Sequence, residues 1–221
     1  MKELPLILIG GGGSCIEIID LIGDINNKRN DQFIKIIGIL DDNENSKKII
    51  NGVKVVGKLK DIKFFKKEKF FVNIFHSENR FKRIKLIKSL KINISRFMSI
   101  IHPNSLVGRK VRVGMGVLIY PGCCIFSGSS IGNFCNIVTN SSIAPNVKIE
   151  ENCYIGKDVL IGTGTKIKKN TYLGYCSSVL EEGLIEEGCR VMPHAFIKLK
   201  MKQKKMIIGG SPARALFKEK I

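Results

Sequence analysis

The sequence predicts an α/β domain followed by a parallel β-helix built from hexapeptide repeats. Two observations carry this prediction. Residues 99–200 repeat an apolar position every six residues without interruption, and the first thirty residues follow a strand, glycine turn and helix pattern. The boundaries that follow are residues 1–97 for the α/β domain and 98–221 for the β-helix with a short tail.

The six-residue period excludes the common secondary structures. Residues 99–200 divide into 17 hexads, and the third place of each is Ile, Val or Leu, from Ile101 to Ile197. A helix would need spacings of three and four, and a plain strand would alternate by two. A triangular β-helix fits, because each hexad can be a short strand plus a corner and three hexads make one coil. The third-place side chain then points inward and stacks on its counterparts in the neighbouring coils.

The start of the chain is typical of a nucleotide-binding unit. A buried parallel strand at 4–9 leads into Gly10, Gly11, Gly12, Gly13 and Ser14, and Ile residues at helical spacing follow. Glycines let a backbone approach a phosphate, and the free N–H groups of a helix N-terminus attract anions. The pattern departs from GxGxxG, since Cys15 stands where the third glycine would lie. A tight turn without a ligand is the alternative.

A second strand, 34–40, ends in Asp41 and Asp42. An acidic residue after the second strand of such a unit usually meets a ribose or a base. The alternative is an exposed turn with two solvated carboxylates. We also expect strands at 53–56 and 70–75, and an amphipathic helix at 78–90 with a basic outer face. In the tail, GGSPARAL predicts a turn and a short helix with Pro212 in its first turn.

Composition narrows the class of protein. The net charge is +18, from 37 Lys+Arg against 19 Asp+Glu. The excess is scattered lysine without a recognition motif, so we expect no nucleic-acid binding; a basic surface does suit phosphate-rich substrates. The seven cysteines contain no CxxC pair, which predicts free thiols in a cytoplasmic protein and no metal site. We expect no secretory signal and no membrane span.

Both halves of the sequence resemble one family. The chain is similar to the bacterial sugar acyltransferases that join a nucleotide-binding α/β domain to a left-handed β-helix, including UDP-4-amino-sugar N-acetyltransferases and sialic acid O-acetyltransferases. The resemblance covers nearly the whole chain. It rests on LILIGGGGS at 6–14, GILDD at 38–42, HPNSLVG at 102–108, the hexads, and GGSPAR at 209–214.

The resemblance implies a homotrimer with active sites between neighbouring β-helices. The α/β domain would hold the nucleotide of the sugar substrate, through the Gly10–Gly13 turn, Ser14, Asp41 and Asp42. Acetyl-CoA would lie along the β-helix wall as co-substrate. The positions that match its binding site are Gly162, Gly174, Gly210 and Arg214. Left-handed crossovers break the usual rule for parallel strands, and hexapeptide solenoids are its known exception.

This sequence departs from the family where the chemistry is expected. Members usually carry a general-base histidine in the eighth hexad, and that place is Pro145 here. Two further family histidines match Tyr154 and Ser14. Proline cannot move a proton, so the catalytic residue is unknown.

Three explanations stay open. In the first, another residue is the base, and the reachable kinds are His102, His194, Tyr154, Glu150, Glu151 and Asp158. Both histidines also fit a structural corner, and an ordinary phenol is a poor base. In the second, positioning alone lets an amine attack the thioester, which works better for an amine than for an alcohol. In the third, the protein has lost its chemistry.

The leading hypothesis is therefore an acetyl-CoA-dependent N-acyltransferase that acts on a nucleotide-linked amino sugar in bacterial surface-glycan synthesis. In it, a backbone N–H beside the cleft stabilises the oxyanion. One alternative is a catalytically silent trimeric protein of the same fold that binds nucleotide or CoA. The other is a sugar O-acetyltransferase of the sialic acid type.

Overall fold

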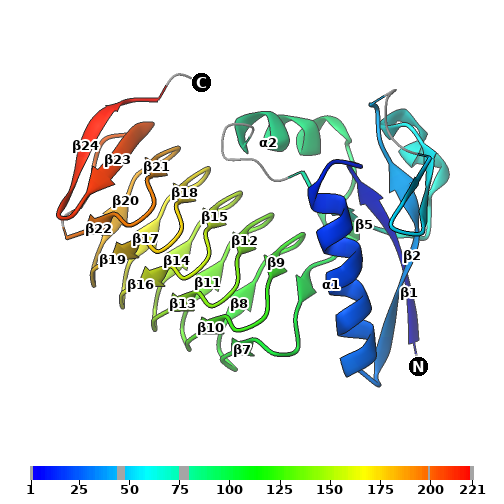
Figure 1. Cartoon of the computed structure of the whole chain (residues 1–221), viewed down its shortest axis with the longest axis horizontal. Coiled ribbons are helices and arrows are strands. Elements are labelled where there is room, and N and C mark those ends of the chain that lie inside the picture. Colours follow the sequence, from blue (N-terminus) through cyan, green and yellow to red (C-terminus); the bar gives the residue numbers. More distant parts are fainter. Residues whose placement is uncertain (1, 44–47, 75–79, 199, 220–221) are drawn as a thin grey trace. The chain divides into compact units, whose positions relative to one another are not determined.

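The computed structural model describes residues 2–43, 48–74, 80–198 and 200–219. The chain divides into two compact units, Met1–Pro103 and Asn104–Ile221. The first is an α/β unit and the second is a β-helix with a C-terminal hairpin (Figure 1). Within the described residues, no helix combines the length and apolarity needed to cross a membrane.

The α/β unit is built on a five-stranded sheet with the order β3-β4-β2-β1-β5. Strands β1, β2, β4 and β5 are parallel, and β3 pairs antiparallel with β4. Their bounds are β1 (Lys2–Ile9), β2 (Gln32–Leu40), β3 (Ile49–Ile50), β4 (Val53–Gly57) and β5 (Lys69–Val72). The expected strands 4–9, 34–40 and 53–56 are confirmed. The expected strand 70–75 ends earlier, and residue 75 lies outside the described residues.

Among the described residues, this unit also contains α-helices and short 3₁₀-helices. They are α1 (Ser14–Lys28), η1 (Leu59–Phe64), α2 (Arg80–Ser89) and η3 (Ile94–Arg96), and β6 (Ile100–Ile101) follows. Helix α1 was expected from the spacing of the Ile residues after the glycine turn, and its buried face consists of Cys15, Ile18, Ile22 and Ile25. The expected basic outer face of α2 is confirmed, because Lys82, Lys85 and Lys88 are exposed. Arg80 and Arg83 are buried on the inner side, and residues 78–79 lie outside the described residues.

The β-helix has the predicted six-residue register. Each two-residue strand occupies the second and third places of a hexad and pairs in parallel with the equivalent strands of the neighbouring coils. From Ile119 to Ile197 every third-place side chain is buried. Three sheets form three faces, seen as stacked arrows in Figure 1. A corner, which we number like the face before it, follows each strand and takes the fourth to sixth places.

The first face contains β7 (Leu106–Val107), β10 (Cys124–Ile125), β13 (Ser142–Ile143), β16 (Leu160–Ile161), β19 (Ser178–Val179) and β22 (Phe196–Ile197). The second face contains β8 (Arg112–Val113), β11 (Ser130–Ile131), β14 (Lys148–Ile149), β17 (Lys166–Ile167) and β20 (Leu184–Ile185). The third face contains β9 (Leu118–Ile119), β12 (Asn136–Ile137), β15 (Tyr154–Ile155), β18 (Tyr172–Leu173) and β21 (Arg190–Val191).

Small polar residues at the first place of the hexads tie each coil to the next. Ser141 donates its hydroxyl to the carbonyl of Gly156, 15 residues later, at 2.7 Å. The Cys135 thiol donates likewise to Glu150 at 3.0 Å. The same i to i+15 bond is made by Ser129, Cys153, Thr165 and Thr171. These bonds satisfy buried donors, so the first-place cysteines are structural parts of the wall. All seven cysteines are free.

The tail differs from the prediction. Instead of a turn and a short helix, β23 (Met206–Gly210) and β24 (Ala213–Lys218) form an antiparallel hairpin. Strand β23 also pairs with β21 and so extends the third face. Pro212 stands in the hairpin turn and not in a helix. The available sheet edge overrides the local pattern, because a strand added there satisfies backbone groups that would otherwise stay unpaired.

Candidate active site

The glycine turn lies at the carboxyl edge of the central strands of the α/β unit. Strand β1 ends at Ile9, and the Gly10 N–H donates to the carbonyl of Leu40 at 2.9 Å, which ties the turn to the end of β2. Gly10 has φ +104°, a conformation that favours glycine. A Cβ on Gly11 would lie 2.6 Å from Oδ2 of Asp41, whereas a Cβ on Gly12 or Gly13 would meet no described atom within 4 Å. The structure therefore brings the predicted turn and Asp41 together.

Asn73 joins this group from the end of β5. Its backbone N–H donates to the carbonyl of Ile9 at 3.1 Å, and its carbonyl accepts the hydroxyl of Ser14. The side chain is 1% exposed, and among the described residues no group meets its amide nitrogen or its oxygen with hydrogen-bond geometry. A buried polar group without partners is costly, so the site suits a polar ligand. Sequence reasoning missed Asn73, although a lone polar residue in the apolar run FFVNIF was the available signal.

Asp42 is bound to the chain that follows β4. Its carboxylate accepts the backbone N–H of Leu59 at 2.8 Å and so anchors the start of η1. Cys15 lies on the buried face of α1 close to Asn73 and Asp41. Burial raises the pKa of its thiol to about 11, despite the Asn73 amide, and the negative charge of Asp41 adds to the effect. The thiol therefore stays protonated at neutral pH.

These groups offer complementary chemistry. The open backbone at Gly12 and Gly13 leads into the N-terminus of a 15-residue helix, which favours an anion such as a phosphate. The Asp41 carboxylate accepts hydrogen bonds, and the Asn73 amide can donate and accept them. A phosphate joined to a polar ring with hydroxyl or N–H groups would satisfy all three features.

The Pro145 corner follows β13 on the first face. The carbonyl of Pro145 accepts the N–H of Gly164 in the next coil at 3.1 Å, and Asn146 takes φ +60°. None of the fourth-to-sixth-place residues along this corner is a histidine in the sequence. The corner therefore has no imidazole of its own.

His102 is buried and hydrogen-bonded within the α/β unit. It is 1% exposed, and its Nε2 lies 2.7 Å from Oδ2 of Asp24 on α1. Hydrogen bonds from Lys28 first, and from His102 second, hold the pKa of Asp24 below its ordinary value. The geometry is that of a structural anchor.

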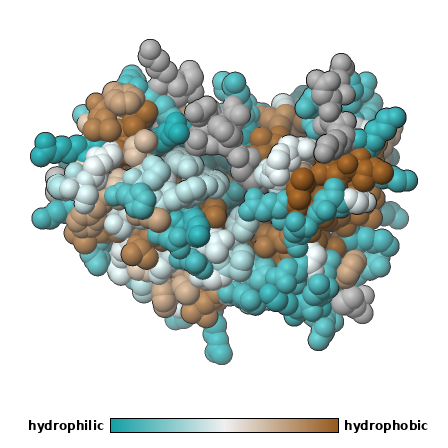
Figure 2. Space-filling model, viewed as in Figure 1, coloured by the Kyte–Doolittle hydropathy of each residue, from teal (hydrophilic) through white to brown (hydrophobic). Residues whose placement is uncertain are grey.

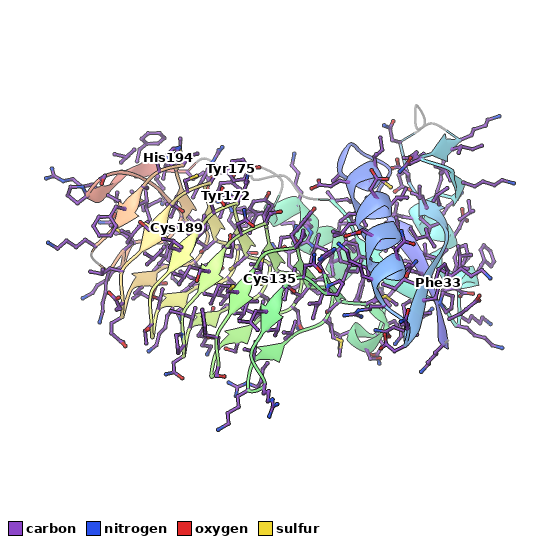
Figure 3. All side chains as sticks on the ribbon, turned by 60° about the horizontal axis from the view of Figure 1, so that its bottom comes forward. Phe33, Cys135, Tyr172, Tyr175, Cys189 and His194 are labelled. Atoms are coloured by element: carbon purple, nitrogen blue, oxygen red, sulfur yellow. The ribbon has the colours of Figure 1, made fainter. Side chains whose placement is uncertain are left out.

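The other two ring candidates lie on the third side of the β-helix. Tyr154 stacks on Tyr172 with ring centroids 5.1 Å apart. Burial, and then a hydrogen bond with Tyr175, raises the pKa of Tyr154 well above its ordinary value, so it cannot be the base near neutral pH. His194 is exposed at the third corner, and its backbone N–H donates to the Tyr175 carbonyl at 2.9 Å. Figure 3 shows Tyr172, Tyr175 and His194 along one margin of the β-helix.

The acidic candidates are also at other corners. Glu150 and Glu151 belong to the second corner, and Asp158 to the third. Glu150 accepts hydrogen bonds from the Lys168 ammonium at 3.0 Å and from the Lys169 N–H at 3.2 Å. Burial raises its pKa, but these bonds and the nearby lysine charges outweigh burial and lower it overall. The structure does not bring these carboxylates to Pro145.

The positions expected to bind acetyl-CoA are of two kinds. The N–H groups of Gly162 and Gly174 already donate to the carbonyls of Val179 and Val191, at 2.8 and 2.9 Å, so neither is free for an oxyanion. Side chains there would collide with the next coil, which explains both glycines by packing. Gly210 and Arg214 belong to the hairpin. Beside it is a pocket of about 240 Å³ lined by Lys200, Met201, Lys202, Gln203, Met206, Ile208 and Ala215.

Comparison with known families follows this geometry. The model of the GMPPB C-terminal domain matches residues 89–208, which is more than half of the chain. The chain belongs to the GMPPB C-terminal domain family. The PglD N-terminal domain matches residues 5–87, which include the glycine turn, Asp41 and Asn73. This pairing confirms the resemblance to the left-handed β-helix sugar acyltransferases. No curated protein sequence matches the chain.

Solved structures share the fold across both units. A perosamine N-acetyltransferase variant from Caulobacter crescentus, in complex with CoA and GDP-perosamine, superposes with a TM-score of 0.82 at 22% identity, covering 96% of this chain and 97% of that one. The acetyltransferase domain of PglB from Neisseria gonorrhoeae, in complex with acetyl coenzyme A, gives 0.81 at 17% identity, covering 97% and 100%. WeeI from Acinetobacter baumannii gives 0.65 at 19%, covering 97% and 100%. The predicted left-handed β-helix is confirmed.

Proposed function

We propose that this protein is an acetyl-CoA-dependent N-acyltransferase that acts on a nucleotide-linked amino sugar in bacterial surface-glycan synthesis. The observation that carries the proposal is the convergence of an open glycine turn, Asp41 and the buried Asn73 amide in a unit that precedes an acyltransferase-type β-helix. The similar solved structures that hold GDP-perosamine or acetyl coenzyme A support it.

Each part of the turn would contact one part of the nucleotide. The helix N-terminus would bind the diphosphate, because its N–H groups and dipole favour negative charge. The Asp41 carboxylate would accept hydrogen bonds from the ribose or base, and Asn73 would pair with the remaining polar edge. A Cβ on Gly11 would displace the carboxylate, so glycine there keeps Asp41 in place.

The missing imidazole favours an amine as the acceptor. An uncharged sugar amine can attack the thioester carbonyl when both are held in position, since orientation supplies much of the acceleration. The C–S bond then breaks, and the amine proton leaves to the thiolate or to water. A sugar hydroxyl is a weaker nucleophile whose attack depends more strongly on a base, and Pro145 stands where the family has its histidine base.

Acetyl-CoA would bind along the β-helix toward the hairpin. Lys200 and Lys202 line the pocket beside β23 and suit phosphate groups, while Met206 and Ile208 supply apolar contact. The free cysteines are in keeping with a cytoplasmic enzyme.

We further propose that the first face joins three copies of the chain. Its outward second-place residues carry no charge, whereas Arg112, Lys148 and Lys166 project from the second face. Leu106 and Leu160 are 58% and 55% exposed, and Phe126 and Leu180 beside them are also exposed. The edge where these strands lie carries brown and pale atoms in Figure 2. An uncharged surface with several exposed apolar side chains suits a second copy better than solvent.

A thiol-release assay tests the function. Purified protein and acetyl-CoA are mixed with UDP-, dTDP- and GDP-linked amino sugars, and matched hydroxy sugars serve as controls. We expect free CoA with an amino sugar only, and a product that survives mild alkali. An alkali-labile product would establish O-acylation instead. Tight ligand binding by calorimetry without any CoA release would identify the silent binder.

A further inference from the structure

Glycines and larger residues alternate along the first corner. The sixth places of successive coils there are Lys110, Gly128, Asn146, Gly164, Glu182 and Lys200. Gly128 lies one coil below Asn146, and the Asn146 side chain fills the space that a Cβ on Gly128 would take. Glu182 does the same over Gly164, and its carboxylate oxygen Oε1 is the atom nearest to that space. The Glu182 side chain therefore points toward the preceding coil, along the line of sixth-place residues, and not outward from its own coil.

This geometry brings a carboxylate to the coil next to Pro145. The Gly164 N–H donates to the Pro145 carbonyl at 3.1 Å, so Gly164 stands directly over the Pro145 corner. Neighbouring coils are about 4.8 Å apart, which is the spacing of paired strands. The Glu182 carboxylate lies over Gly164 and is therefore roughly one such spacing from the corner, although its own backbone is two coils away. A group on a sugar could bridge that distance.

Covering a glycine does not itself require a charge. At the third corner the Asn140 amide covers Gly122, and at the second corner the Phe134 ring covers Gly116. Both glycines have positive φ, as Gly164 does, so the backbone geometry is shared. The acid over Gly164 therefore differs from the residues that do the same packing elsewhere. Because Glu182 lies next to the corner that lacks the family histidine, its carboxylate could accept a proton there.

We propose that Glu182 is the general base of the acyl transfer, an inference that rests on the proposed function. The amine nitrogen forms a bond to the thioester carbonyl carbon and passes one proton to the Glu182 carboxylate. The C–S bond breaks as the tetrahedral intermediate collapses to the amide. The Glu182 carboxylic acid then gives the proton to the departing thiolate, which leaves as the thiol. Glu182 replaces solvent as the first proton acceptor.

Paired glutamine variants test this role. Glu182→Gln keeps the length and the cover over Gly164 but cannot take a proton, so we expect kcat to fall about 100-fold or more with KM nearly unchanged. Glu181→Gln changes the adjacent exposed carboxylate and should stay within about twofold of the unaltered enzyme. Glu182→Ala should regain activity with added formate, which a purely structural role would not allow.

The outcomes distinguish a failure of the Glu182 assignment from a failure of the proposed acyltransferase function. If the unaltered protein releases CoA with an amino sugar nucleotide but Glu182→Gln does so equally well, the base assignment is wrong and the function stands. The assignment also fails if both glutamine variants lose activity alike, or if formate rescues nothing. If the unaltered protein releases no CoA with any amino sugar nucleotide, the proposed function fails and the base role fails with it.

Discussion

The two candidate sites are assembled in opposite ways. The glycine turn collects Gly11, Asp41 and Asn73 from the ends of three different strands, all within one chain. The Pro145 corner is one level of a column that repeats once in every coil, and it borders an apolar face that we propose to be shared between copies. A site of the first kind depends on long-range pairing. A site of the second kind depends on the alignment of successive coils and on the neighbouring copy of the chain.

Introducing a charge on the first face should have the largest effect, because it should abolish assembly and CoA release but leave nucleotide binding intact. Leu160→Glu places a carboxylate on the exposed apolar centre of that face, so we expect monomers and loss of nearly all CoA release. Nucleoside diphosphate binding at the glycine turn should persist, because that site lies within one chain. Light scattering, the thiol assay and calorimetry measure the three effects.

Lys166→Glu is the matched control, since it reverses charge at the same hexad place on the second face. It should leave the oligomer intact. A trimeric Leu160→Glu protein would show that the first face is not the interface.

Core truncation should separate the stability of the two units. Ile155→Ala removes a fully buried side chain from the stacked interior, and Leu8→Ala removes one from β1. Each should cost about 2–5 kcal/mol in free energy of unfolding. We expect Ile155→Ala to lower only the β-helix transition and Leu8→Ala only the α/β transition in calorimetric melts. A single shared transition lowered by both would mean that the units unfold together.

A single methyl group tests the glycine turn more gently. Gly11→Ala would place a Cβ 2.6 Å from the Asp41 carboxylate and 2.9 Å from Ile50, so that carboxylate must move. We expect about tenfold weaker binding of the nucleotide sugar by calorimetry. Gly23→Ala adds the same methyl group inside α1, outside the turn, meets no described atom within 4 Å and should bind nearly as well as the unaltered protein. Equal affinities for all three proteins would remove Asp41 from the site.

The smallest effect concerns an ion pair on the second corner. The pKa of Glu150 is lowered in the folded protein, so the pair stabilises the fold above the pKa of an unfolded glutamate, about 4.3. That contribution is lost as pH falls through the lower folded value. Because Glu150 and Lys168 are partly exposed, we expect Glu150→Gln to cost at most about 1 kcal/mol at pH 7.

Denaturant unfolding at pH 7 and pH 3 measures this difference. The difference in free energy of unfolding between the variant and the unaltered protein should be smaller at pH 3 than at pH 7. A gap that widens in acid would contradict the assigned direction of the pKa shift.

The fold was more predictable than the sites. The in-phase aliphatic residues predicted the strand register because a solenoid repeats one local solution, and each hexad needs only its copies above and below. The hairpin after Met206 was not predictable from local residues, since the edge of β21 decides it. Asp41 was expected from topology. The buried amide of Asn73 depends on the distant glycine turn, and the turned-back side chain of Glu182 depends on the neighbouring coil; no short motif records either relation.

The covered glycines couple the chain to itself at a fixed interval. Gly116 and Phe134, Gly122 and Asn140, Gly128 and Asn146, and Gly164 and Glu182 are each separated by one full coil, and in each pair one residue occupies the space that the other leaves empty. Neither member can change size alone without disturbing its partner. In evolution, the two positions of a pair should be replaced together. A deletion of one residue between them would break every such pair that spans it, so this repeat can grow or shrink only by whole coils.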